Sequence, residues 1–185
     1  RPLRKSPLKT LQCDYCPLQN LRGLENCLTL DRLFINSCQL KDLSPLSGLQ
    51  LKVCHIANND IDDIKALNMP SLIDLILSNC PIKDLSPLAG TSLTRLNISK
   101  LHIADLSALQ GPPLIRLFID GCPVKDISPL QSIKTLKELR LPDNWEDYQA
   151  LEAFKTVKYI YTGRARKERE VFIEELRKKK QSLKE

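Results

Sequence analysis

A unit of 21 or 22 residues repeats along most of this 185-residue chain, and it constrains the fold more than any other feature. Seven consecutive blocks open with close variants of L-x-x-L-x-L-x-x-C/N. The blocks start at Leu8, Leu30, Leu51, Leu72, Leu93, Leu114 and Leu136, and a degenerate eighth block starts at Val157. A fixed period of this length predicts a solenoid, because one unit cannot bury its leucine face alone and must stack on its neighbours.

The first half of each block predicts a short strand. Its first, fourth and sixth positions are apolar, and the alternation between the fourth and sixth positions places one face of the strand in the core. The ninth position holds a small polar side chain that we expect to bond the backbone where the chain leaves the strand. These side chains are Cys16, Cys38, Asn59, Cys80, Cys122 and Asn144.

The second half of each block predicts one helical turn on the outer side. It reads x-I/L-x-D-L-S-P-L-x-G in the most regular units, as in Gln39 to Gly48 and Pro81 to Gly90. Serine is a good N-cap and proline suits the first helical position, so we expect each Ser-Pro to start a turn. We expect the aspartates of this half to cap the same turns: Asp42, Asp63, Asp84, Asp105 and Asp126.

Together these motifs resemble the leucine-rich repeat family over roughly residues 8–160. The D-L-S-P-L variant is similar to bacterial, internalin-like repeats, and closer still to repeats attached to bacterial Ser/Thr protein kinases. The resemblance implies an α/β leucine-rich repeat solenoid, with a curved parallel β-sheet on the concave side and short 3₁₀ or helical turns outside. Cys54 at a fourth position, Leu101 at a ninth position and Asp63-Ile64-Lys65-Ala66 predict local irregularity in the third and fifth units.

The pattern loosens after Asn144, so we divide the chain into repeats at 1–144 and a C-terminal cap at 145–185. We expect a helix over 145–155, a last strand over 156–161, a turn at Gly163 and a terminal helix over 164–180. An open solenoid end needs a cover with a polar outer face. The beginning of the chain offers no comparable cover, which predicts possible self-association through the first repeat.

Composition and spacing argue against catalytic or metal chemistry. The chain has only two histidines, His55 and His102, and six glycines. Cys13-x-x-Cys16 suggests a redox or zinc motif, but its residues fall on repeat positions that call for small buried side chains. We therefore expect structural thiols, no catalytic residues, no metal and no cofactor. Seven cysteines, an odd number spaced mostly by the repeat, favour a reducing compartment and predict a cytoplasmic location.

The charge distribution argues against a nucleic-acid-binding surface. The net charge is +6, but residues 164–185 carry nine Lys/Arg against five Glu, which leaves only +2 for the first 163 residues. We expect the basic run from Arg177 to Lys180 to be a solvated helix face. No apolar run is long enough for a membrane span, so we expect no membrane insertion of this segment.

The outward-facing side chains of the strands are the best candidate for a binding site. Several are aromatic or aliphatic where a solvated strand is usually polar, and arginines stand among them, which is the composition of a protein-binding surface. The predicted site consists of Arg32, Phe34, His55, Ile76, Arg95, Asn97, Arg116 and Phe118. The alternative explanation is β-propensity alone, since exposed strands also favour such residues.

The sequence therefore predicts a non-catalytic module that binds a protein or peptide through its concave β-face. The alternative is a sensor or scaffold segment of a larger bacterial Ser/Thr protein kinase. That alternative follows only from the resemblance, because no kinase motif occurs in this sequence. A third possibility is a purely structural spacer.

Overall fold

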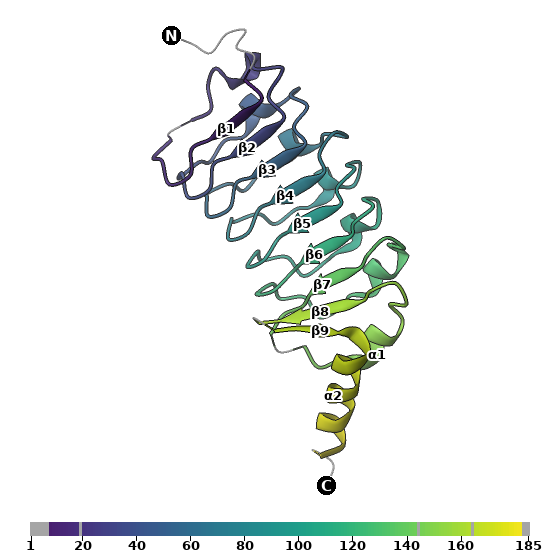
Figure 1. Ribbon diagram of the computed structural model, residues 1–185. Coiled ribbons are helices and arrows are strands. Elements are labelled where there is room, and N and C mark those ends of the chain that lie inside the picture. The colour runs from purple at the N-terminus through teal and green to yellow at the C-terminus, as the bar shows by residue number, and fades with distance from the viewer. Residues whose placement is uncertain (1–7, 19, 144, 164, 183–185) are drawn as a thin grey trace.

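The computed structural model describes residues 8–18, 20–143, 145–163 and 165–182. Within these ranges, nine strands follow one another in a single sheet in chain order, and six 3₁₀ turns, η1 to η6, alternate with the first seven strands (Figure 1). The strands are β1 (Thr10–Gln12), β2 (Arg32–Phe34), β3 (Val53–His55), β4 (Asp74–Ile76), β5 (Arg95–Asn97), β6 (Arg116–Phe118), β7 (Glu138–Arg140), β8 (Tyr159–Thr162) and β9 (Ala165–Glu168). The turns are η1 (Leu24–Asn26), η2 (Ser44–Leu46), η3 (Lys65–Leu67), η4 (Ser86–Leu88), η5 (Ser107–Gln110) and η6 (Ser128–Ser132), and the helices are α1 (Tyr148–Glu152) and α2 (Arg169–Ser182).

The repeat sets the register of the sheet. Strands β1 to β8 pair in parallel, and each pairing aligns the same repeat positions, so that Arg32 lies beside Val53, Leu33 beside Cys54 and Phe34 beside His55. The fourth position is buried from β2 to β8, while the third and fifth positions face outward. The third and fifth units keep this register, so the predicted irregularity at Cys54 and Leu101 is wrong: both side chains are buried in the core like their counterparts.

The residue before the ninth position adopts the left-handed conformation in successive repeats. Its φ lies between 55° and 72° at Tyr15, Ser37, Asn58, Asn79, Lys100 and Gly121. The ninth side chain, which follows this turn, is buried from the second to the sixth repeat. The Asn59 amide donates to the Ile35 and Ile56 carbonyls and accepts from the Cys38 and Leu40 amides.

Cysteine thiols occupy the same place in three other repeats. Each thiol points to the carbonyl of the sixth position one repeat earlier, with Sγ–O distances of 2.9 Å from Cys38, 3.4 Å from Cys80 and 3.1 Å from Cys122. The predicted side-chain bonds at the ninth position are therefore present at five described positions. Four of them tie one repeat to the previous one, whereas the Cys16 thiol lies 3.6 Å from the Asp14 carbonyl of its own repeat. Asn144 lies outside the described residues.

Aspartates cap the outer turns, as predicted, but serine is not the N-cap. The helical segments begin at the serine itself, and the preceding leucine or isoleucine takes the N-cap position without a side-chain bond. In η2, the Asp42 carboxylate accepts from the Ser44 backbone N–H at 2.7 Å and from the Ser44 hydroxyl at 2.8 Å. The same pair of bonds recurs at Asp84, Asp105 and Asp126, and Asp63 accepts the Lys65 N–H.

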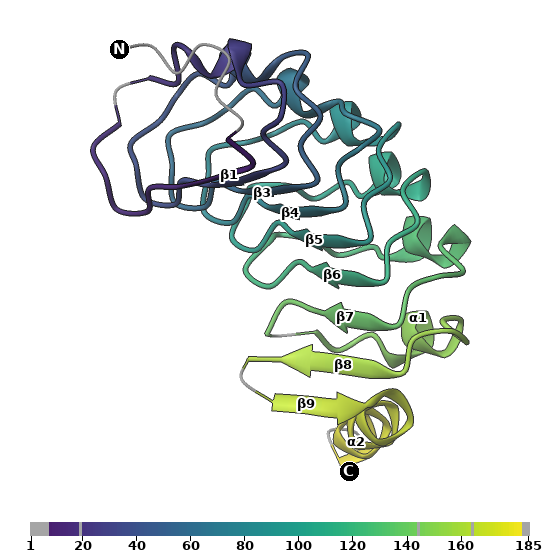
Figure 2. The same ribbon diagram turned by 45° about the horizontal axis from the view of Figure 1, so that its top comes forward.

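One continuous apolar core fills the space between the sheet and the outer turns. Leucine and isoleucine from the strands meet leucines from the turns, such as Leu46, Leu67 and Leu88. Figure 2 shows that the sheet lies on the inner side of the curved solenoid and the 3₁₀ turns on its outer side. The outward-facing strand residues therefore line a concave face.

The C-terminal segment differs from the prediction in its last strand. β8 continues the parallel sheet, but residues 165–168, expected to be helical, form β9, which pairs antiparallel with β8 after the turn at Gly163. Backbone groups at the open edge of β8 find partners in β9, and this gain outweighs the helix propensity of Ala-Arg-Lys-Glu. α1 is also shorter than predicted, and α2 begins only at Arg169.

The terminal helix packs against the end of the solenoid. Phe172, Ile173 and Leu176 of α2 are buried in the common core, whereas Val171 is half exposed. The basic face of α2 is exposed, as predicted, and it also forms ion pairs: Arg177 with Glu152 at 2.6 Å and Lys179 with Glu146 at 2.7 Å. Among the described residues no helix is both long and apolar enough to cross a membrane. The boundary between repeats and cap at residues 144 and 145 stays a prediction.

Candidate protein-binding surface

The eight predicted site residues all lie on the concave face. The pairing register places Arg32, Arg95 and Arg116 in the column of third positions, and the other five in the column of fifth positions. The three arginines are exposed, and Phe34, His55, Ile76, Asn97 and Phe118 are partly exposed. The parallel register therefore brings together side chains that lie 21 residues or more apart in sequence.

Strands β2 to β5 form the first part of this surface. The Phe34 and His55 rings meet edge to face, with centroids 4.9 Å apart. His55 Nε2 lies 3.5 Å from Asp74, and an Arg95 guanidinium nitrogen lies 2.8 Å from the other oxygen of the same carboxylate. Burial opposes ionisation of Asp74, but His55 and Arg95 outweigh it, so that the pKa of this carboxyl is lowered.

Strands β6 to β8 form the second part. Arg116 Nε lies 3.1 Å from Glu138, and the Tyr161 hydroxyl donates to the same carboxylate at 3.0 Å. Burial, followed by this bond to Glu138, raises the pKa of the Tyr161 phenol. The Arg140 guanidinium lies over Phe118, 4.7 Å from the ring centroid, and also over Tyr161 at 5.3 Å. These cation–π contacts hold the Arg140, Phe118 and Tyr161 side chains together.

A hollow of about 330 Å³ lies between these two parts. It is lined by both charged and apolar groups, which suits a partner with side chains of both kinds. The lining residues are His55, Asp74, Leu75, Ile76, Arg95, Leu96, Asn97, Arg116 and Phe118. Six of these nine belong to the site predicted from the sequence.

Four residues of this surface were missed by the sequence-based prediction: Asp74, Glu138, Arg140 and Tyr161. The first three stand in the same columns as the predicted residues, so the repeat itself could have found them. Tyr161 belongs to the degenerate eighth block, whose outward positions are recognisable only because β8 continues the sheet.

No protein-family model and no curated protein sequence matches the chain. Its fold does match solved structures. The internalin InlF of Listeria monocytogenes superposes with a TM-score of 0.65 and 24% identity, over 80% of this chain and 52% of InlF. Internalin C2 of the same bacterium gives 0.64 and 23%, over 84% and 80% of the two chains. A leucine-rich repeat protein of Leptospira interrogans gives 0.73 and 17%, over 82% and 42%.

This is a leucine-rich repeat fold. The resemblance of the sequence to internalin-like repeats is thus confirmed for the architecture, and at these identities the likeness shows the fold alone. The chain spans about half the length of InlF.

The cysteines of the leucine-rich repeats belong mainly to the core. None of the seven cysteines forms a disulfide in the described part of the chain; Cys13 and Cys16 are partly buried and the other five are buried. Burial raises the pKa of Cys54 to about 12, and contact with Cys16, followed by burial, raises the pKa of Cys13 to about 11. Cys27, for which the repeat pattern gave no explanation, packs in the core directly after η1.

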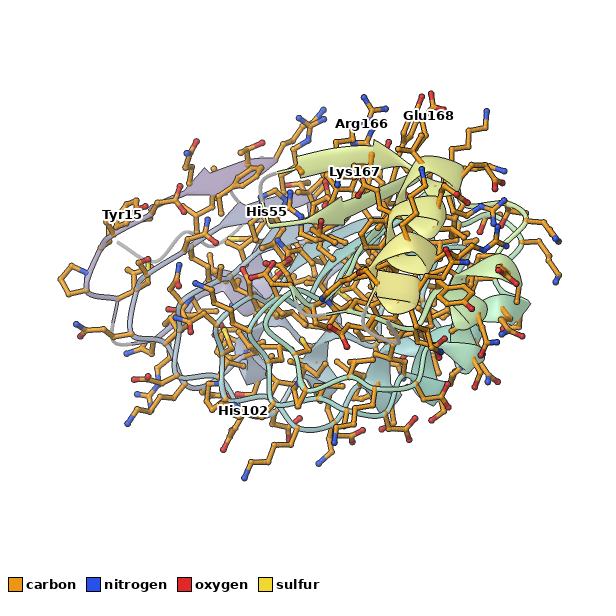
Figure 3. All side chains as sticks on the ribbon, turned by 90° about the horizontal axis from the view of Figure 1, so that it is seen from below. Tyr15, His55, His102, Arg166, Lys167 and Glu168 are labelled. Carbon is orange, nitrogen blue, oxygen red and sulfur yellow. The ribbon has the colours of Figure 1, made fainter. Side chains whose placement is uncertain are left out.

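The two histidines of the leucine-rich repeats lie far apart. Figure 3 shows His55 among the strands and His102 on the opposite side of the solenoid. Within the described ranges, no group of three or more His, Cys, Asp or Glu side chains is arranged to hold a metal ion. Figure 3 also shows Tyr15 pointing away from the solenoid at the first repeat, and 82% of this residue is exposed.

Proposed function

We propose that this chain is a non-catalytic protein-interaction module that binds a protein or peptide through its concave β-face. The observation that carries the proposal is the hollow on β3 to β6, where arginines and apolar side chains converge. Aromatic and arginine residues in central positions contribute most of the binding energy in protein interfaces. The proposed binding residues are those predicted from the sequence: Arg32, Phe34, His55, Ile76, Arg95, Asn97, Arg116 and Phe118.

The preformed contacts of this face support binding over a purely structural role. β-Propensity explains single aromatic residues on exposed strands, but it does not explain why Arg140 contacts both Phe118 and Tyr161, whose rings also contact each other. Side chains that are already ordered lose less conformational entropy when a partner binds. A spacer has no need of such an arrangement.

Further parts of the proposal concern the context of the module. We propose that residues 145–185 act as its C-terminal cap, since α2 buries three apolar side chains against the end of the core. A reducing, cytoplasmic compartment of a bacterial cell agrees with seven cysteines that form no disulfide in the described part of the chain. The kinase-associated alternative, the absence of a cofactor and self-association through the first repeat stay predictions.

A binding comparison between two quadruple variants tests the proposal. One variant changes Phe34, Arg95, Arg116 and Phe118 on the concave face to alanine. The matched control changes four exposed residues of the outer side, Lys41, Lys83, His102 and Lys125, to alanine. In pull-downs from the cells that make the protein, we expect partners to be lost only with the concave variant, while both variants keep the wild-type melting temperature. Equal retention of the partner by a well-folded concave variant would move the site away from the strands.

A further inference from the structure

Two arginines lie side by side at the centre of the concave face. Arg95 of β5 and Arg116 of β6 are direct partners in the pairing register. Neighbouring strands are about 4.8 Å apart, and like charges directly opposite each other on a sheet destabilise it. The third positions of β4 to β7 thus carry an acidic, a basic, a basic and an acidic side chain in sequence: Asp74, Arg95, Arg116 and Glu138.

Each arginine is paired with a carboxylate on the strand that flanks the pair, β4 for Arg95 and β7 for Arg116. Arg95 contacts Asp74 at 2.8 Å and Arg116 contacts Glu138 at 3.1 Å, so the two guanidinium groups use acceptors in opposite directions. The arginine side chains are 51% and 50% exposed, whereas the two carboxylate side chains are each only 15% exposed. The charge that an approaching partner meets here is therefore mainly positive.

The arginine pair has room for one more acceptor. A guanidinium carries five N–H donors, and a single carboxylate contact leaves several of them for another oxygen. An anion placed between Arg95 and Arg116 would also offset their mutual repulsion. The structure therefore favours an anionic group at this point of the hollow.

An apolar surface on β4 and β6 adjoins the pair. Ile76 and Phe118 stand two positions further along β4 and β6 and line the same hollow. Ile73 and Ile115 directly precede β4 and β6, and both are exposed. A partner whose acidic group reaches the arginines can thus place an apolar side chain beside it.

We infer that the concave face binds a peptide segment in which an aspartate or glutamate adjoins a large apolar residue. Its carboxylate lies between Arg95 and Arg116, and its apolar side chain lies against Phe118 and Ile76. This inference rests on the proposed function and specifies the chemistry of the partner. A carboxylate suits the site better than a phosphate, because the four charges of the row already sum to zero and a dianion would lie beside two carboxylates.

A peptide selection tests the inference on the full chain. The probe is a library of random 12-residue peptides displayed on phage, and enriched peptides are synthesised for affinity measurement. We expect enriched peptides that carry Asp or Glu beside Leu, Ile or Phe. Replacing this acidic residue by its amide should weaken binding to wild type at least fivefold. This ratio between the affinities of the acid and amide peptides should shrink at high salt.

Variants of the chain assign the effect to the two arginines. In Arg95→Gln/Arg116→Gln the acid and amide peptides should bind within twofold of each other. In the control, Lys83→Gln/Lys125→Gln on the outer side, the fivefold preference should persist. Selection on Arg95→Glu/Arg116→Glu should enrich Lys or Arg in place of the acidic residue. Melting curves establish that each variant is folded.

Other outcomes would overturn the inference about an acidic peptide, the proposed binding through the concave face, or both. Peptides that depend on Phe118 but show no acidic preference would refute the inference and leave concave binding intact. Tighter binding of a phosphoserine peptide than of the glutamate peptide would refute the choice of a carboxylate. Peptides that bind the concave quadruple variant as well as wild type, or no enrichment of any peptide, would count against both the inference and the proposed function.

Discussion

At the scale of single residues, the ninth repeat position connects each repeat to the one before it. Asn59 is 4% exposed and its amide satisfies backbone groups of two consecutive repeats. Cys38, Cys80 and Cys122 also donate to a carbonyl, but a sulfur atom is a weaker acceptor for the neighbouring backbone N–H groups than the Asn59 amide oxygen is. The ninth position thus contributes stronger hydrogen bonds between repeats where it holds asparagine than where it holds cysteine.

Replacing Asn59 by alanine should destabilise the fold by about 2–5 kcal/mol, because it leaves the buried Cys38 and Leu40 amides without their acceptor. Cys122→Ala is the matched control and should cost only about 1 kcal/mol, since it removes one sulfur atom and the weak hydrogen bonds of a thiol. Urea unfolding of both variants measures the difference. Equal losses would show that the amide network adds nothing beyond the volume of the side chain.

The outer turns depend on aspartates whose ionisation is linked to folding. Backbone N–H bonds from the residue two positions later, followed by side-chain bonds, lower the pKa of Asp42, Asp84 and Asp126. A carboxyl whose pKa is lower in the folded state stabilises the fold above its unfolded pKa, near 3.9, and loses this contribution as the pH falls through the folded pKa. We therefore expect the urea midpoint to fall as the pH drops below about 4.

The variant Asp42→Asn/Asp84→Asn/Asp126→Asn should lose less stability over this acid range, because an amide accepts the same bond without titrating. The control, Asp31→Asn/Asp60→Asn/Asp62→Asn, changes aspartates outside the capping position and should keep the wild-type acid loss. Urea midpoints between pH 2 and 6 give the comparison. An identical acid profile for wild type and the capping variant would disprove the linkage.

At the scale of elements, two equivalent glycines of the outer side differ in how closely the neighbouring repeat approaches. A Cβ at Gly111 would lie 2.3 Å from the Ala89 carbonyl oxygen, whereas a Cβ at Gly90 would meet only the Asn68 side chain at 3.5 Å. Neither position requires a positive φ. We expect Gly111→Ala to destabilise by about 1–3 kcal/mol through overpacking and Gly90→Ala to be close to neutral. Equal melting temperatures for the two variants would contradict this packing.

The repeat predicts most elements of this fold because the same positions recur at a fixed spacing. Arg32, Val53 and Asp74 can be assigned to one column from their spacing alone. β9 cannot be predicted in this way, because Ala165–Glu168 lacks apolar alternation and becomes a strand only through the open edge of β8. The candidate site shows the same division. Its columns follow from the repeat, but the choice of partner by Arg95 and Arg116 depends on side-chain packing that spacing does not encode.

At the scale of the whole molecule, the open end of the solenoid is covered by β9 and α2. Phe172, Ile173 and Leu176 together contribute roughly 4–9 kcal/mol of burial, which is comparable with the total stability of a domain. Deleting residues 165–185 should therefore cause aggregation or unfolding from the C-terminal side.

The variant Ile173→Ala/Leu176→Ala removes part of the same packing without deleting the helix. Hydrogen exchange of this variant measures the loss of stability at the C-terminal end of the solenoid. We expect faster exchange in β7 and β8 than in β4, with wild-type rates in β4. The control is Val171→Ala, because Val171 is half exposed on the same helix. A truncated chain that stays monomeric at the wild-type melting temperature would mean that α2 is only a tail.

The central claim is that the concave strands of this leucine-rich repeat module contact a protein partner. Site-specific photo-crosslinking tests it most directly: a photoreactive phenylalanine analogue is placed at Phe118 on the concave face or at His102 on the opposite side, in the cells that make the protein. The account predicts a discrete protein adduct from position 118, its loss when Arg95 and Arg116 are also changed to glutamine, and no such adduct from position 102. An adduct from position 102 alone, or one from position 118 that persists without the two arginines and Phe34, would contradict it.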